Sequence, residues 1–307
     1  MSSSRLEVIA AGIQFQNPLL LAAGTAGYGR EIACLIPLDE LGGLITKAVS
    51  LEPRAGAPAP RVADLESGMI NAVGLANPGA DEVRASHLPW LEKNVSRAKI
   101  IVNVVGDTTS AFGQVISRID DSPAVSAYEL NVSCPNVRGG GMEFGADNAA
   151  LAELVAGARA ATKKPLFVKL SPMLPKIAET ARHAVGAGAD GISVVNTIPG
   201  LAIDVERRAP VLGFGTGGVS GSGLLPVGVL AAFRVSKAVA VPVIGVGGVS
   251  SAEDVLQYVM AGASLVATGT AAMRSPRLAP QIVRDLDRWC DDHGVAGIGE
   301  LRGAVSW

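Results

Sequence analysis

Hydrophobic residues recur along this chain as short continuous runs. The runs occupy residues 19–24, 43–49, 100–106, 127–132, 165–170, 191–196, 242–248 and 264–269. Most of them lack the apolar–polar alternation of a half-exposed strand. Continuous apolar runs of this length are typical of parallel strands that are buried on both faces of a sheet. We therefore predict a strand at each of the eight positions.

Amphipathic stretches of helical length separate many of these runs. The clearest are residues 148–164 and 176–189, and the second ends in glycine-rich turn signals before the next apolar run. Repeated alternation of strand and helix predicts one (β/α)8 barrel, a TIM barrel, formed by a single domain over residues 1–307. A short β-hairpin is expected before it, within residues 6–17. A doubly wound open sheet is the alternative.

The predicted strands end in polar or glycine residues. In a (β/α)8 barrel the carboxyl ends of all strands meet at one mouth, where functional side chains lie. This geometry predicts that the strand-end residues form one site. They are Lys47, Asn103, Asn131, Lys169, Asn196, Gly247, Gly248, Gly269 and Thr270.

Composition and charge exclude several classes of function. The formal net charge is −2, and no run of like charges predicts binding to a nucleic acid or a membrane surface. The first residues, MSSSRLEVIA, lack the features of a signal peptide, and no apolar stretch reaches transmembrane length, so we expect a cytoplasmic protein. Three cysteines and three histidines are widely scattered, which predicts neither a metal site nor a disulfide framework.

Glycine-rich loops after the last two strands predict a phosphate site. In GVGGVSSAEDV, Gly247 and Gly248 precede a helix start capped by Ser250 or Ser251. Bare backbone N–H groups and a helix N-terminus favour an anion. The ATGTAAM segment adds Gly269 and Thr270, and TGGVSGSG offers another glycine turn, at Gly221. The alternative is that these glycines only form turns.

Lysines and asparagines at the mouth indicate an anionic, planar ligand. Lys47 and Lys169 each follow an apolar run, where a buried ammonium is costly unless an anion accompanies it. The alternatives are that these lysines reach the rim, or that Lys169 forms a Schiff base as in an aldolase. Amide groups both donate and accept, so the asparagines suit a ring with alternating C=O and N–H groups. The cluster comprises Asn71 and Asn77 in NAVGLANPG, together with Asn103, Asn131, Asn136 and Asn196.

Cys134 lies just after a strand end, on a loop that continues into the glycine-rich NVRGGGMEFG. An accessible thiolate beside polar groups is able to act as a base. The alternative is that this cysteine is inert packing.

Ordered motifs over nearly the whole chain resemble the class 1 dihydroorotate dehydrogenase family. They are ITKAVSLEPRAG, NAVGLANPG, ELNVSCPNVRGGGMEFG, FVKLSP, VVNTIPG, GGVSG, GVGGV and GTA. The resemblance implies an FMN-dependent (β/α)8 barrel that oxidises dihydroorotate to orotate in pyrimidine biosynthesis. The CPNVRGGGMEFG and NTIPG segments are similar to the NAD-linked B subtype, whereas class 2 enzymes carry an N-terminal extension and a serine base.

The resemblance also implies a role for each residue. Cys134 would remove the C5 proton of dihydroorotate, and Lys47 would lie between the flavin and the substrate carboxylate. Substrate contacts are expected from Lys47, Asn71, Ala72, Val73, Gly74, Leu75, Asn131, Asn196 and Thr197. FMN contacts are expected from Ala23, Lys47, Ala48, Asn103, Asn131, Lys169, Val195, Gly221, Gly247, Gly248, Gly269 and Thr270.

The same resemblance implies partner proteins, and the sequence differs from the family pattern at two places. It implies a homodimeric core within a heterotetramer, whose second subunit carries FAD and a [2Fe–2S] cluster and passes electrons to NAD. Ala23 stands where the family usually has serine, and SGSGLLP replaces the commoner SGPAIKP. A dihydropyrimidine-dehydrogenase-like flavin oxidoreductase and a non-catalytic flavin-binding barrel are the alternative functions.

Overall fold

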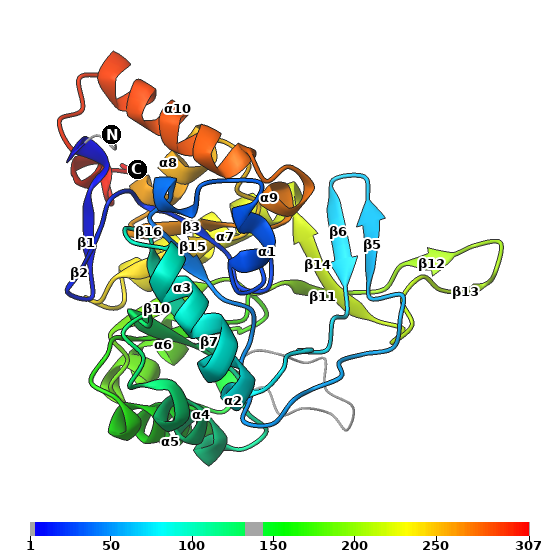
Figure 1. Ribbon diagram of the computed structural model, residues 1–307. Helices are drawn as coiled ribbons and strands as arrows, with labels where there is room; N and C mark the ends of the chain where they lie inside the picture. Colours follow the sequence, from blue (N-terminus) through cyan, green and yellow to red (C-terminus); the bar gives the residue numbers. More distant parts are fainter. Residues whose placement is uncertain (1–3, 133–143, 307) are drawn as a thin grey trace.

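The centre of the molecule is a closed barrel of eight strands, in a computed structural model that describes residues 4–132 and 144–306 (Figure 1). All strand pairs within the barrel are parallel, so the predicted architecture is confirmed and the open sheet is wrong. The order around the barrel is β10 (Gly191–Val194), β15 (Val243–Val246), β16 (Leu265–Thr268), β3 (Leu19–Leu21), β4 (Gly43–Ile45), β7 (Lys99–Val104), β8 (Ala127–Asn131) and β9 (Leu166–Leu170).

Helices form the outer layer of the barrel. In α5, the Asp147 carboxylate accepts hydrogen bonds from the N–H groups of Ala149 and Ala150, and Leu151, Leu154 and Val155 are buried on one face. None of the described helices is both long and apolar enough to cross a bilayer. The helices are α1 (Arg30–Ala33), α2 (Ala80–Glu82), α3 (Leu88–Asn94), α4 (Thr109–Ile119), α5 (Asn148–Ala161), α6 (Ile177–Gly186), α7 (Leu225–Ser236), α8 (Ala252–Met260), α9 (Thr270–Arg274) and α10 (Leu278–Asp292).

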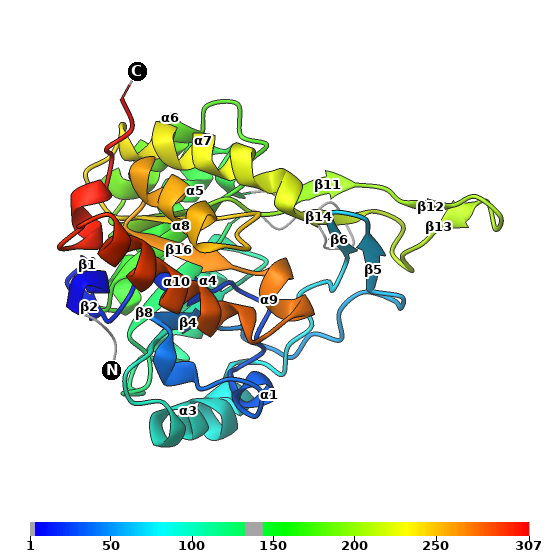
Figure 2. The same ribbon diagram turned by 90° about the horizontal axis from the view of Figure 1, so that it is seen from above.

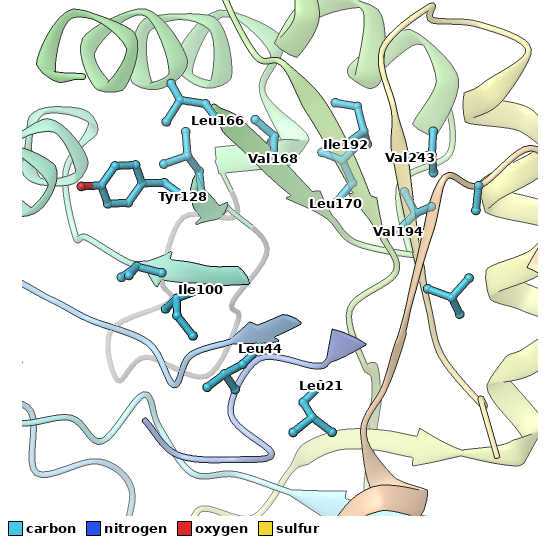
Figure 3. Packing of buried hydrophobic residues seen from close by; sticks show 14 of the residues in the cluster. Leu21, Leu44, Ile100, Tyr128, Leu166, Val168, Leu170, Ile192, Val194 and Val243 are labelled. Atoms are coloured by element: carbon cyan, nitrogen blue, oxygen red, sulfur yellow. The ribbon is translucent and has the colours of Figure 1, made fainter. Parts of the chain in front are cut away.

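Burial on both faces explains why the strands are continuously apolar. One face of each strand joins a large apolar cluster that includes helix residues, and Leu21, Leu44 and Val168 are three of its strand members labelled in Figure 3. The other face points into the barrel, where Ile45, Ile101 and Phe167 belong to a separate apolar cluster. A run that serves both cores has no polar face to expose.

The predicted N-terminal hairpin is confirmed. It comprises β1 (Val8–Ala10) and β2 (Ile13–Phe15), which pair antiparallel. Phe15 and Ala10 are buried in the apolar cluster inside the barrel. The hairpin therefore closes the barrel at the end opposite to the strand-end residues.

A second sheet beside the barrel was not predicted from the sequence. It contains β5 (Val62–Leu65), β6 (Gly68–Asn71), β11 (Ile198–Gly200) and β14 (Gly217–Gly221). The glycine turn expected at Gly221 lies where β14 ends: Gly221 pairs with Gly68, has a φ of 129° and directly precedes a 3-10 turn at Ser222–Leu224. A two-stranded hairpin, β12 (Ile203–Asp204) with β13 (Ala209–Pro210), extends away from the barrel in both views (Figures 1 and 2).

Candidate active site

A cavity of about 560 Å³ opens at the carboxyl ends of the barrel strands. Its volume falls in the range of small-molecule and cofactor sites. Strand ends of the barrel form one part of its lining, and β6 and β14 of the second sheet contribute another. The predicted site residues that line it are Ala23, Lys47, Ala48, Asn71, Val73, Gly74, Leu75, Asn103, Asn131, Lys169, Val195, Asn196, Thr197, Gly221, Gly247, Gly248, Gly269 and Thr270.

Four predicted residues are not placed in the lining, and one of them, Asn77, is described below. Cys134 and Asn136 lie outside the described residues. Ala72 is fully buried in a small cluster with Ile70 and Leu212, and its N–H donates to Arg61 O. Its side chain therefore supports the loop from below the cavity surface.

Polar side chains replace apolar ones in the barrel interior beneath the cavity. Lys169, on β9, is 6% exposed and lies in register with Asn131 on one side and Ser193 on the other. Asn103 and Glu129, on β7 and β8, are also buried. An ammonium group at this depth stabilises negative charge on a molecule bound above it more strongly than it would in water.

The backbone beside Lys47 is held by several hydrogen bonds. The N–H of Lys47 donates to Gly27 O at 2.8 Å, and the Thr46 hydroxyl donates to Lys47 O at 2.9 Å. The Tyr28 hydroxyl donates to Ala48 O at 2.9 Å, and burial raises the pKa of this phenol well above its ordinary value. Tyr28 therefore remains a neutral donor, and the Lys47–Ala48 segment has a fixed path along the cavity.

The amide groups at the mouth are partly oriented by the protein. Asn196 Nδ2 lies 3.4 Å from Asn131 Oδ1, and Asn196 Oδ1 accepts from the N–H of Thr197 at 2.8 Å. Asn71, the last residue of β6, donates from Nδ2 to Gly218 O at 3.2 Å. These amides come from three different segments and line the same cavity.

Asn77 has a structural role instead. Its Oδ1 accepts from the N–H groups of Ser50 and Gly79, and its Nδ2 donates to Leu75 O and to the Ser50 hydroxyl. These bonds tie the loop of residues 71–79 to the segment after β4. Unlike Asn71, Asn77 is absent from the cavity lining.

The predicted phosphate loops have backbone conformations that favour glycine. Gly221, Gly247 and Gly248 have φ values of 129°, 125° and 77°, which other residues rarely adopt. Of the two predicted caps of α8, Ser250 and Ser251, the structure has Ser251 as the N-cap, but the N–H groups of both serines already donate to Asp254. An anion at this end of the cavity would therefore depend on the glycine loops rather than on the start of α8.

Several lining residues were not named from the sequence. Ser67 and Gly68 had no local signal and reach the cavity where β6 pairs with β14, whereas Ser220 and Ser222 lie in the TGGVSGSG segment but were not singled out. Arg274, at the end of α9, donates to Gly68 O at 2.6 Å and to Asp64 at 2.8 Å, and so joins that helix to the second sheet.

The two described cysteines lie away from the cavity. Cys34 is exposed, whereas Cys290 is buried and burial raises its pKa. Within residues 4–132 and 144–306, no group of three or more His, Cys, Asp or Glu side chains is arranged to hold a metal ion.

Comparison with known proteins identifies relatives over nearly the whole chain. The family profile described as dihydroorotate dehydrogenase matches residues 5–289. A Pelobacter propionicus protein named dihydroorotate dehydrogenase B (NAD(+)), catalytic subunit, is 44% identical over 295 residues and covers 96% of each chain. An Anoxybacillus flavithermus protein with the same name is 44% identical over 304 residues, covering 99% of this chain and 96% of the relative.

A solved structure has the same fold. The crystal structure of a dihydroorotate dehydrogenase from Eimeria tenella, in complex with ferulenol, superposes with a TM-score of 0.82. It covers 99% of this chain and 89% of the other, at 22% sequence identity. This similarity supports the barrel architecture alone.

Proposed function

Because the chain belongs to the dihydroorotate dehydrogenase family of oxidoreductases, we propose that it oxidises (S)-dihydroorotate to orotate in this cavity, with FMN as cofactor. The observation that carries the proposal is the convergence of two lysines and a set of amides on one cavity, in a chain 44% identical to named catalytic subunits. Residues 1–307 would act as one FMN-binding domain.

The residues present fit a flavin. The cavity floor offers the Lys169 ammonium and the Asn103 amide, whose buried Oδ1 has no donor among the described residues. The glycine loops at Gly221, Gly247, Gly248 and Gly269 offer backbone to the phosphate end. When bound, FMN supplies a two-electron acceptor that takes hydride from C6 of the substrate.

The other half of the oxidation is removal of a proton from C5. We assign this step to Cys134, whose thiolate Sγ takes the proton as the C5–C6 double bond forms. The Lys47 ammonium would bind the substrate carboxylate. Asn71, Asn131, Asn196 and Thr197 would bind the ring amides and carbonyls, and so hold C5 toward the base.

Electrons would leave through a partner. The relatives are named catalytic subunits of an NAD(+)-linked enzyme, which is consistent with a second subunit that completes the reaction. We propose that this subunit carries FAD and a [2Fe–2S] cluster, and that two copies of this chain form the core of a heterotetramer.

The test is a comparison of two substrates with purified chain and a small artificial electron acceptor. Dihydroorotate should be oxidised, and the protein should show the visible absorption of bound flavin. Dihydrouracil lacks the carboxylate and should react at least about 100-fold more slowly, because Lys47 would lose its partner. Equal rates would favour a dihydropyrimidine-dehydrogenase-like activity, and an inactive yellow protein would indicate a non-catalytic flavin-binding barrel.

A further inference from the structure

Beneath the cavity, Asn103 and Glu129 are joined by a hydrogen bond inside the barrel. Asn103 Nδ2 donates to Glu129 Oε1 at 2.7 Å, between residues that lie opposite each other on β7 and β8. The two residues are 1% and 0% exposed. A hydrogen bond to a carboxyl group in such an interior is shielded from competition by water.

The backbone of Asn103 does not depend on this bond. Its N–H donates to the Thr46 hydroxyl at 3.2 Å, and its carbonyl accepts from the N–H of Val49 at 2.8 Å. Strand β7 is therefore fixed by its neighbours, and only the side-chain amide remains to be oriented. Glu129 Oε2 has no hydrogen-bond partner in the described part of the chain, so within that part the Glu129 carboxyl group bonds to Asn103 through Oε1.

An amide has one donating and one accepting end, so its orientation decides which of the two faces a ligand. With Nδ2 on Glu129, the Asn103 oxygen is turned away, and it is buried without a donor among the described residues. The reversed amide would place two oxygens at 2.7 Å, which repel unless a proton lies between them. Asn103 lines the cavity, so a bound molecule is the available source of the missing N–H or O–H.

A flavin has a group of this kind. Around the pyrimidine edge of an oxidised isoalloxazine ring, N3 carries an N–H, whereas N1, N5 and the two carbonyl oxygens are acceptors. An asparagine that offers its oxygen recognises the N–H, and one that offers its NH2 does not.

We propose that Glu129 is a positioning residue, which holds the Asn103 amide so that its oxygen is available to an N–H of bound FMN. This inference rests on the proposed function, because it needs FMN in the cavity. Glu129 itself touches neither cofactor nor substrate in this proposal and acts through Asn103. Its carboxyl oxygen is needed as an acceptor.

The test is a double-mutant cycle that measures FMN affinity of the full chain. FMN would be removed and titrated back, with the dissociation constant taken from flavin fluorescence. Glu129→Met removes the acceptor at similar size and should weaken binding about tenfold or more. Glu129→Gln keeps an acceptor and should stay within about threefold of wild type.

The second variant of the cycle is Asn103→Ala, which removes the amide through which Glu129 is proposed to act. If Glu129 acts through Asn103, adding Glu129→Met to Asn103→Ala should change FMN affinity by less than about twofold. A merely structural role would give the same loss in both backgrounds. Thermal unfolding of the FMN-free variants reports that structural loss separately.

Three outcomes overturn the inference: no loss in Glu129→Met, an equal loss in Glu129→Gln, or a full loss that persists in the Asn103→Ala background. Where Glu129→Met does not fold, Glu129→Asp withdraws the acceptor by one methylene and takes its place in the same cycle, with the same criteria. Failure of the wild-type chain to bind FMN contradicts the proposed cofactor, whereas wild-type binding with an additive cycle contradicts the role of Glu129 alone.

Discussion

Gly269 has space for a side chain that would point into the cavity. Its φ is −125°, and an added Cβ would lie 3.4 Å from Thr25 and 3.5 Å from Ala22, both cavity-lining residues. Gly269→Asp should therefore fold but repel the FMN phosphate, weakening FMN binding by roughly tenfold or more. Gly269→Ala is the matched control and should bind nearly as wild type. Flavin fluorescence titration measures both, and equal affinity of the two variants would place the phosphate elsewhere.

Gly248 is a poorer position for this test. Its φ is 77°, and a Cβ there would lie 2.5 Å from the backbone nitrogen of Leu225. A substitution would disturb the start of α7 whether or not FMN binds. A colourless Gly248→Asp protein would therefore not distinguish lost phosphate binding from a distorted loop.

Cys134 is the proposed base, on a segment outside the described residues. Cys134→Ala should retain FMN but lose flavin reduction by dihydroorotate by about 100-fold or more, the scale of a positioned base. Cys134→Ser should recover some activity at high pH, because serine releases its proton less readily. Stopped-flow absorbance measures this step. The exposed Cys34, changed to serine, is the control and should have no effect, and near-normal reduction in Cys134→Ala would exclude this role.

The chain's strand-end residues could be predicted because barrel geometry brings every strand end to one mouth. Lys47, Asn103 and Lys169 follow apolar runs and line the cavity as expected. Glu129 was not singled out, since it lies within a strand and its importance depends on a neighbour 26 positions earlier. Asn77 was grouped with the ligand amides because its internal hydrogen bonds leave no mark in the sequence.

At the scale of elements, the eight barrel strands were predictable and the second sheet was not. Each barrel strand lies in a mainly apolar run, which is a local signal. Strands β6 and β14 are short, β14 is glycine-rich, and the Asn71–Gly218 contact that joins them spans 147 positions. Such pairing depends on the closed barrel that brings the two loops together.

Close packing of β11 and β14 positions Thr197 at the cavity. A Cβ on Gly218 would lie 2.0 Å from Thr197 Oγ1 and 2.7 Å from its Cβ. Gly218→Ala should therefore displace this stiff side chain, destabilise the protein by about 1–3 kcal/mol and raise the KM for dihydroorotate. Thermal unfolding and steady-state kinetics measure the two effects.

Gly157 is the matched control for that substitution. It lies within α5, and an added Cβ would meet nothing within 4 Å. Gly157→Ala should leave KM unchanged and stabilise the protein by up to about 1 kcal/mol. An unchanged KM in Gly218→Ala as well would mean that the second sheet does not shape the substrate site.

The turn before β7 depends on the Asp39 carboxylate. Burial favours protonation, but hydrogen bonds from the N–H groups of Ala98, Arg97 and Ser96 and from the Ser96 hydroxyl outweigh it, so the pKa of Asp39 is lowered. A lowered pKa in the folded state contributes stability above the unfolded pKa of about 3.9, and this stability is lost as pH falls through the folded value.

Asp39→Asn should therefore lower the free energy of unfolding by about 1–2 kcal/mol at pH 7. The NH2 group of the asparagine would face N–H donors that the carboxylate oxygen accepts from in the wild type. The difference from wild type should narrow as the pH falls below about 4. Urea unfolding of both proteins at pH 7 and below about pH 4 measures this difference in the free energy of unfolding. A difference that stays constant, or widens in acid, would contradict this account of Asp39.

At the scale of the whole molecule, the chain should be unable to reduce NAD alone. No strand–GxGxxG–helix unit followed by an acidic ribose ligand is found in the sequence, and three dispersed cysteines do not form a four-cysteine cluster site. Dihydroorotate and NAD should give no sustained NADH formation until the electron-transfer subunit is added. Multiple-turnover NADH formation by the isolated chain would contradict the partner proposal.

The central claim is that dihydroorotate reduces FMN within this chain. The most direct measurement is an anaerobic titration of the purified, FMN-loaded chain with dihydroorotate, followed by visible absorbance. The flavin band should bleach, with one orotate formed per FMN reduced when no other acceptor is present. A band that dithionite bleaches but dihydroorotate leaves unchanged would contradict the claim, because the flavin would be competent and the proposed substrate would not be its donor.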